Sequence, residues 1–85
     1  MDNKKRIKIL ELSFNIMENL LTSRKYASKE ELIAFAKKAL DKSVENAEMP
    51  IELKMGYAEA YRKLESLSWE EIQEIIEIIS DEDED

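Results

Sequence analysis

The sequence predicts an all-α fold, a compact bundle of four helices at about residues 4–22, 29–47, 51–66 and 69–79, with a disordered acidic C-terminal tail. Its 85 residues include one Gly and one Pro, so residues that interrupt helices are scarce. Apolar residues, 44% of the chain, recur every three or four positions, the spacing that places them on one helix face. Charged residues make up 39%, as in chains dominated by surface helices. We expect one domain over 1–80 and a tail over 81–85.

The helix over 4–22 carries two apolar stripes separated by Ser13. A helix that is apolar over more than half of its circumference normally lies at the centre of a bundle or in a subunit interface. Four short helices leave part of this surface uncovered, so we predict that one stripe forms a homodimer interface. The first stripe is Ile7, Leu10, Phe14, Met17 and Leu21, and the second, which we assign to the interface, is Ile9, Leu12, Ile16 and Leu20.

Local signals mark the next two helices. Ser28 and Glu31 form a capping box before the helix over 29–47. Pro50 ends that segment, because Pro disfavours the helical conformation in the residue before it but suits the start of a helix. The helix over 51–66 contains Gly56, which costs roughly 1 kcal/mol relative to Ala, so a close helix crossing or an earlier break is expected there.

The helix over 69–79 has the sharpest start in the chain. Ser68 and Glu71 form a second capping box, and Leu67 is placed to pack against Ile72 as a hydrophobic staple. The inward face is expected to carry Trp69, Ile72, Ile75, Ile76 and Ile79. Five acids follow Ser80, and they lie at the negative end of the helix dipole, so we expect them to be disordered when unbound.

Charge is distributed unevenly along the chain. Residues 1–42 have a net charge of +4, residues 43–85 have a net charge of −11, and no base follows Lys63. Such asymmetry bears on partners and association rates. An acidic chain of this kind is expected to bind a basic protein. Direct nucleic-acid binding is disfavoured, because the net charge is −7 and the residues expected of a recognition helix are missing.

The composition argues against catalysis. The chain has no His and no Cys, so the usual general base, the commonest metal ligand and thiolate nucleophiles are all missing. One Gly cannot build a phosphate-binding loop. Glu70 and Glu74 are spaced as a pair in a carboxylate-metal enzyme would be, but acids in such bundles face inward, whereas these are expected to face outward. We predict no enzyme, cofactor or metal site.

The outer face of the helix over 69–79 is the candidate partner-binding surface. Glu70, Glu74 and Glu77 share one row with Asp81, and a step of four residues advances about 6 Å along a helix axis. This resembles the spacing of phosphates along a nucleic-acid strand, so the row is suited to occupy a basic groove built for DNA or RNA. The bland alternative is a solvated acidic face with a solubilising tail. The predicted binding residues are Glu70, Glu71, Glu74, Glu77, Ile78, Asp81, Glu82 and Asp83.

The leading hypothesis is therefore an acidic helical inhibitor or regulator that binds a nucleic-acid-binding surface of another protein, as a nucleic-acid mimic. In size and charge the chain resembles small acidic inhibitors of nucleic-acid enzymes, including phage anti-defence proteins such as anti-CRISPRs, and the resemblance is one of type. The alternative is a homo-oligomeric structural or regulatory bundle that uses the first helix as its interface. The longest apolar run has five residues, against roughly 20 for a membrane span, so we expect a cytoplasmic protein.

Overall fold

Four helices make up the fold, as predicted. The computed structural model describes residues 3–83, with side chains as far as residue 80. The helices are α1 (Asn3–Ser23), α2 (Lys29–Glu45), α3 (Ile51–Ser66) and α4 (Trp69–Asp83). No strand is present within the described residues. The observed bounds lie within two residues of the predicted ones, except at the end of α4.

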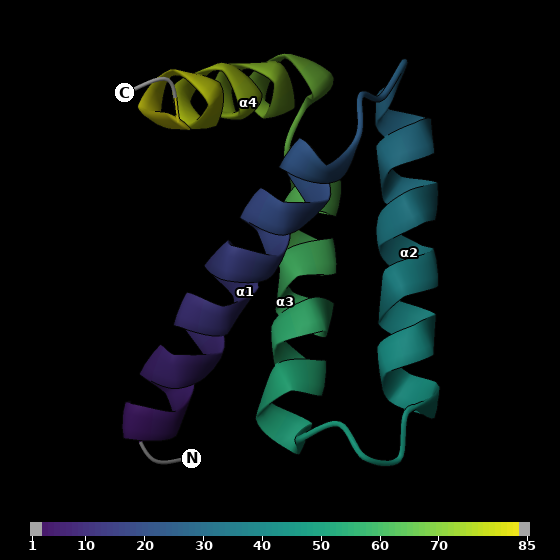
Figure 1. The fold of residues 1–85 in the computed structure, drawn as a ribbon, viewed down its shortest axis with the longest axis vertical. Helices are drawn as coiled ribbons and strands as arrows, with labels where there is room; N and C mark the ends of the chain where they lie inside the picture. Colours follow the sequence, from purple (N-terminus) through teal and green to yellow (C-terminus); the bar gives the residue numbers. More distant parts are fainter. Residues whose placement is uncertain (1–2, 84–85) are drawn as a thin grey trace.

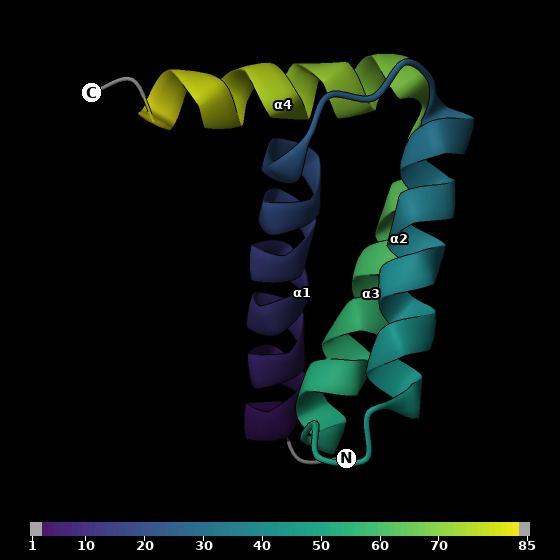
Figure 2. The ribbon, with the colours of Figure 1, turned by 45° about the vertical axis from the view of Figure 1, so that its right-hand side comes forward.

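The first three helices run alternately up, down and up, and α4 crosses one end of them (Figures 1 and 2). α3 packs against both α1 and α2. In Figure 2, α4 lies beside the link between α1 and α2 and projects beyond α1. The central helix is therefore α3. The apolar character of α1 suggested a central or interface position for α1 itself, and α1 instead lies on one side of α3.

Small residues on α3 explain this arrangement. A Cβ atom at Gly56 would lie 3.1 Å from Leu12 Cβ and 3.2 Å from Ile16 Cδ1, which is closer than ordinary van der Waals contact. Ala60, one turn further along α3, is fully buried. The glycine thus lies at a close crossing of α1 and α3, one of the two explanations expected from the sequence, and α3 is unbroken there.

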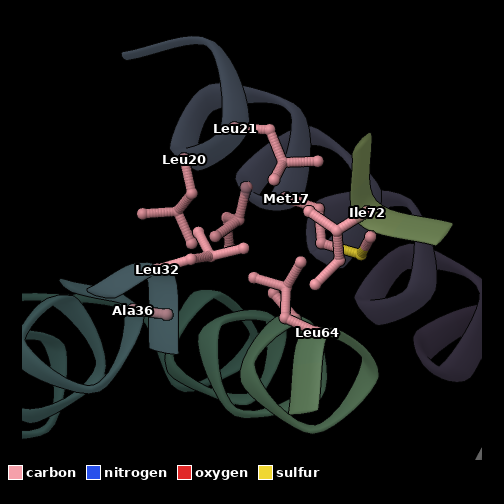
Figure 3. Packing of buried hydrophobic residues seen from close by; sticks show 9 residues of the cluster. Met17, Leu20, Leu21, Leu32, Ala36, Leu64 and Ile72 are labelled. Carbon is pink, nitrogen blue, oxygen red and sulfur yellow. The ribbon is translucent and has the colours of Figure 1, made fainter. Parts of the chain in front are cut away.

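All four helices contribute to the core, which is shown in Figure 3. Leu32 from α2, Leu64 from α3 and Ile72 from α4 are each 0% exposed. They meet Met17, Leu20 and Leu21 from the last turns of α1. The core is therefore concentrated at the end of the bundle that α4 covers, and Ile72 is the fully buried residue through which α4 enters it.

Both predicted capping serines act as N-caps. Ser28 Oγ accepts a hydrogen bond from the Glu31 N–H (3.3 Å) at the start of α2. At the start of α4 the box is reciprocal: the Glu71 N–H donates to Ser68 Oγ (3.1 Å), and the Ser68 N–H donates to Glu71 Oε1 (2.9 Å). The Glu31 side chain instead accepts a hydrogen bond from Arg24 Nη2 (2.7 Å). The start of α4 is the better-defined of the two.

The end of α4 differs from the prediction. The helix continues to Asp83, four residues beyond the expected end at Ile79. Extending an existing helix forms one backbone hydrogen bond for each residue ordered, whereas an acid near the C-terminus costs only about 0.3–1 kcal/mol. The backbones of Asp81, Glu82 and Asp83, assigned to the tail from the sequence, are therefore helical. Residues 84 and 85 lie outside the described part of the chain.

The stripe predicted to form a homodimer interface packs against α3 of the same chain. Ile9, Ile16 and Leu20 are buried, and Leu12 is half-buried where α1 crosses Gly56. This stripe faces α3, so it does not form a free surface, and the predicted interface is corrected on that point. The apolar surface that α1 leaves exposed belongs to the other stripe.

Candidate partner-binding surface on helix α4

The acidic row, Glu70, Glu74 and Glu77, lies on the side of α4 that faces away from the core. Ile72, Ile75 and Ile79 lie on the opposite side, against the core cluster. All three carboxylate side chains are exposed. Because the Ser68 cap and buried Ile72 hold the helix at both sides of Glu70, the row is presented from an ordered element. The structure therefore brings these three predicted site residues together.

No cation neutralises the acidic row within the described residues. The three ion pairs found there are Arg24–Glu31 (2.7 Å), Lys37–Asp41 (3.7 Å) and Arg62–Glu59 (3.3 Å), and they involve other carboxylates. The helix that carries the row, α4, has no basic residue in its last turn. The row's three carboxylates are thus exposed and take part in none of these ion pairs.

A groove runs along the acidic row, between α4 and the link that joins α1 to α2. This groove, here called the α4 groove, has a volume of about 950 Å³. Its apolar lining includes Leu21, Trp69 and Ile76. Its full lining is Leu21, Thr22, Arg24, Lys25, Tyr26, Trp69, Glu70, Gln73, Glu74, Ile76, Glu77 and Ser80.

The wall opposite the acidic row is basic and aromatic. Arg24 lies over the rings of Tyr26 and Phe35, with Cζ 5.4 and 5.6 Å from the two centroids, while its guanidinium also binds Glu31. The Tyr26 hydroxyl donates to the Leu20 carbonyl oxygen (2.5 Å), which ties the link to the end of α1. Arg24 is therefore already paired within its own wall, and the groove has an acidic side opposite a side that is aromatic and basic, which Lys25 also lines.

Glu71 has a structural role besides its predicted role in binding. The Ser68 backbone N–H and then the Ser68 hydroxyl hold the pKa of the Glu71 carboxyl below its ordinary value. One carboxylate oxygen is thereby committed to the helix start. Glu71 does not line the α4 groove. We therefore separate it from the acidic row.

The remaining predicted binding residues lie toward the C-terminal end of α4. Ile78 is 60% exposed, so it is available to a partner as the sequence suggested. It lies outside the α4 groove. The side chains of Asp81, Glu82 and Asp83 lie outside the described residues.

Sequence reasoning missed the wall formed by Thr22, Arg24, Lys25 and Tyr26. The segment lies between two predicted helices, and its residues were not assigned to the binding surface. A signal was present in Tyr26, an aromatic residue beside two bases, but its position relative to α4 depends on how the chain folds back. Trp69 was expected in the core, and it both packs against the core and lines the groove.

Among the described residues, no group of three or more acidic side chains is placed to hold a metal ion, and no helix is long and apolar enough to cross a membrane. Comparison of the chain with the models of known protein families, with curated proteins and with solved structures finds no match. The function must therefore be argued from the acidic row and its surroundings.

Proposed function

We propose that this chain is an acidic protein-interaction module that inhibits or regulates a nucleic-acid-binding protein by occupying its basic surface. The observation that carries the proposal is the acidic row, three exposed carboxylates on one ordered helix. None of the three takes part in an ion pair with a described residue. Carboxylates held on a helix meet a basic surface without a large ordering cost, because the helix is already folded.

The spacing of the row supports a surface built for phosphates. Glu70 and Glu74 are one helical step of four residues apart, about 6 Å along the axis, and Glu77 continues the same line. In a nucleic-acid-binding protein, the lysine and arginine side chains that contact the phosphate backbone supply most of the nonspecific affinity for nucleic acid. The same side chains would therefore be attracted to the acidic row, and nucleic acid would compete with it.

The α4 groove offers a place for one of those basic side chains. The aliphatic stem of a lysine or arginine would pack against Ile76, which is half-buried and lines the groove, since such stems bury readily against apolar surface. Its charged head would reach the acidic row, and Trp69 would present an aromatic surface to it. Exposed Ile78, on the neighbouring side of α4, would add an apolar contact.

We also propose a cytoplasmic location, where the chain would meet nucleic-acid-binding proteins.

The proposed binding by the acidic row is tested by capturing proteins from a cell lysate on the wild-type chain and on the variant Glu70→Gln/Glu74→Gln/Glu77→Gln. The matched control is Glu30→Gln/Glu45→Gln/Glu48→Gln, which removes the same charge from exposed positions outside α4.

We expect the wild type and the control variant to retain a common basic protein, and we expect duplex DNA or RNA to release it. The acidic-row variant should lose that protein. If both variants capture the same proteins, or if nucleic acid releases none of them, the acidic row is a solvated helix face and the proposal is wrong.

A further inference from the structure

The stripe of α1 that begins at Ile7 and ends at Leu21 has two halves with different surroundings. Met17 and Leu21, in its C-terminal half, are 7% and 2% exposed, because α4 crosses there and packs Ile72 against them (Figure 3). The N-terminal half continues on the same face without this cover. It consists of Ile7, Leu10 and Phe14, which are 56%, 36% and 58% exposed. Three large apolar side chains are therefore exposed on one face of α1.

The surface around this N-terminal half has the composition of an interface. Met55 and Ala58 from α3 line a hollow of about 410 Å³ together with Ile9 and Leu10, and the charged residues Arg6 and Glu59 also line it. Beside it, Lys63 Nζ lies 4.2 Å from the centroid of the Phe14 ring. An apolar centre with a charged rim is typical of protein–protein contacts. The patch therefore extends from α1 onto α3.

Charge selects the orientation in which two such patches could meet. The N-terminal end of α1 carries Lys5, Arg6 and Lys8, all exposed, whereas the acidic row lies on α4 at the other end of α1. A parallel pair would place the two basic ends together and the two acidic helices together. An antiparallel pair places the basic end of each copy at the α4 end of the other, and it also opposes the two helix dipoles favourably.

We propose that two copies of this chain pair through the exposed half of the α1 stripe, with their α1 helices antiparallel. A two-fold axis between positions 10 and 11 would place Ile7 of one copy opposite Phe14 of the other, while the two Leu10 side chains meet at the axis. Asn3 of one copy would then lie opposite Glu18 of the other. Each contact occurs twice, as a two-fold interface requires. The apolar contacts of the pair lie on α1, and the pairing is tested without the proposed partner of α4.

The first test is the mass in solution, measured by sedimentation equilibrium over a series of concentrations. The variant Ile7→Ser removes an apolar side chain from the patch, and Val44→Ser is its matched control, a β-branched residue 61% exposed on α2. We expect the wild type and Val44→Ser to dimerise alike. Ile7→Ser should raise the dimer dissociation constant at least about tenfold, since the lost contact occurs twice. A wild-type mass that stays monomeric at every concentration overturns the proposal and leaves the patch to another partner.

The second test determines orientation and needs no loss of apolar contacts. The chain contains no cysteine, so Asn3→Cys and Glu18→Cys each introduce one thiol. A short bifunctional thiol reagent should join the two variants when they are mixed. It should join neither variant to itself, because each position would lie about 22 Å along the axis from its own counterpart. Self-linking of Asn3→Cys would indicate a parallel pair, and failure to link the mixture would exclude the proposed register; either result contradicts the proposal.

Discussion

Ile72 anchors α4 in the core, so Ile72→Ala should loosen the helix that carries the acidic row. The side chain is 0% exposed and belongs to a core cluster that includes residues of all three other helices. Replacing Ile by Ala removes three carbons at about 0.8 kcal/mol each, and the cavity left behind adds to that loss. The better helix propensity of Ala returns about 0.4 kcal/mol. The net cost is about 3 kcal/mol, a large share of the roughly 4–13 kcal/mol expected for a domain of 85 residues.

Urea denaturation checks this prediction with two probes. Far-UV circular dichroism follows all four helices, whereas the fluorescence of Trp69, the single Trp in the chain, follows the start of α4. Ile72→Ala should lower the midpoint of both transitions, and the melting temperature should fall by about 12–24 °C. Ile78→Ala, at a position 60% exposed on the same helix, should change stability by less than about 0.5 kcal/mol. Equal effects of the two variants would refute the reasoning, because α4 would then not be held through Ile72.

Three further predictions test other parts of the structure. Gly56→Leu should destabilise the fold by about 1–3 kcal/mol in thermal melts, because even a Cβ there would lie 3.1 Å from Leu12 Cβ; an unchanged melting temperature would argue against the close crossing. The folded-state pKa of Glu71 is depressed by Ser68, so its stabilising contribution is present above the ordinary value of 4.5 and is lost as pH falls through the lowered pKa. Glu71→Gln should therefore flatten the loss of stability below pH 4.5, as followed by denaturation at several pH values, and an identical profile would contradict this. Arg24→Ala removes the contacts of Arg24 with Tyr26 and Glu31 and should lower the free energy of unfolding by about 1 kcal/mol in urea denaturation; the cost is small because these contacts are partly exposed. A gain in stability would show that these contacts do not hold the link.

The helix boundaries were predictable where a short sequence encodes them. Ser68 and Glu71 specify the start of α4 through hydrogen bonds between neighbouring residues, and Pro50 is the N-cap residue of α3. The apolar repeat also identified the inward face of α4. Near the end of α2 the repeat is less informative. Val44 lies four residues after Leu40 and continues the apolar repeat, but it is 61% exposed. Ser43 is buried instead, with its hydroxyl donating to the Leu40 carbonyl oxygen (2.7 Å).

Contacts between helices were harder to predict, because they depend on how distant segments meet. The two stripes of α1 are equally apolar in sequence, so nothing local shows that the stripe containing Ile16 faces α3 while Phe14 remains exposed. Gly56 was the one available signal, and it was compatible with either a crossing or a break. The acidic row was predictable from helical spacing alone. The α4 groove was not, because the position of Tyr26 beside α4 is set by the path of the link.

The central claim is that Glu70, Glu74 and Glu77 bind a basic, nucleic-acid-binding surface. Its most direct test is the dissociation constant of the captured partner, measured by calorimetry at several salt concentrations for the wild type and for Glu70→Gln/Glu74→Gln/Glu77→Gln. If the three carboxylates make the contact, the wild-type affinity for the partner falls steeply as the salt concentration rises. The variant then binds weakly, and its affinity depends much less on salt. Affinity that is independent of salt and unchanged in the variant would contradict the claim.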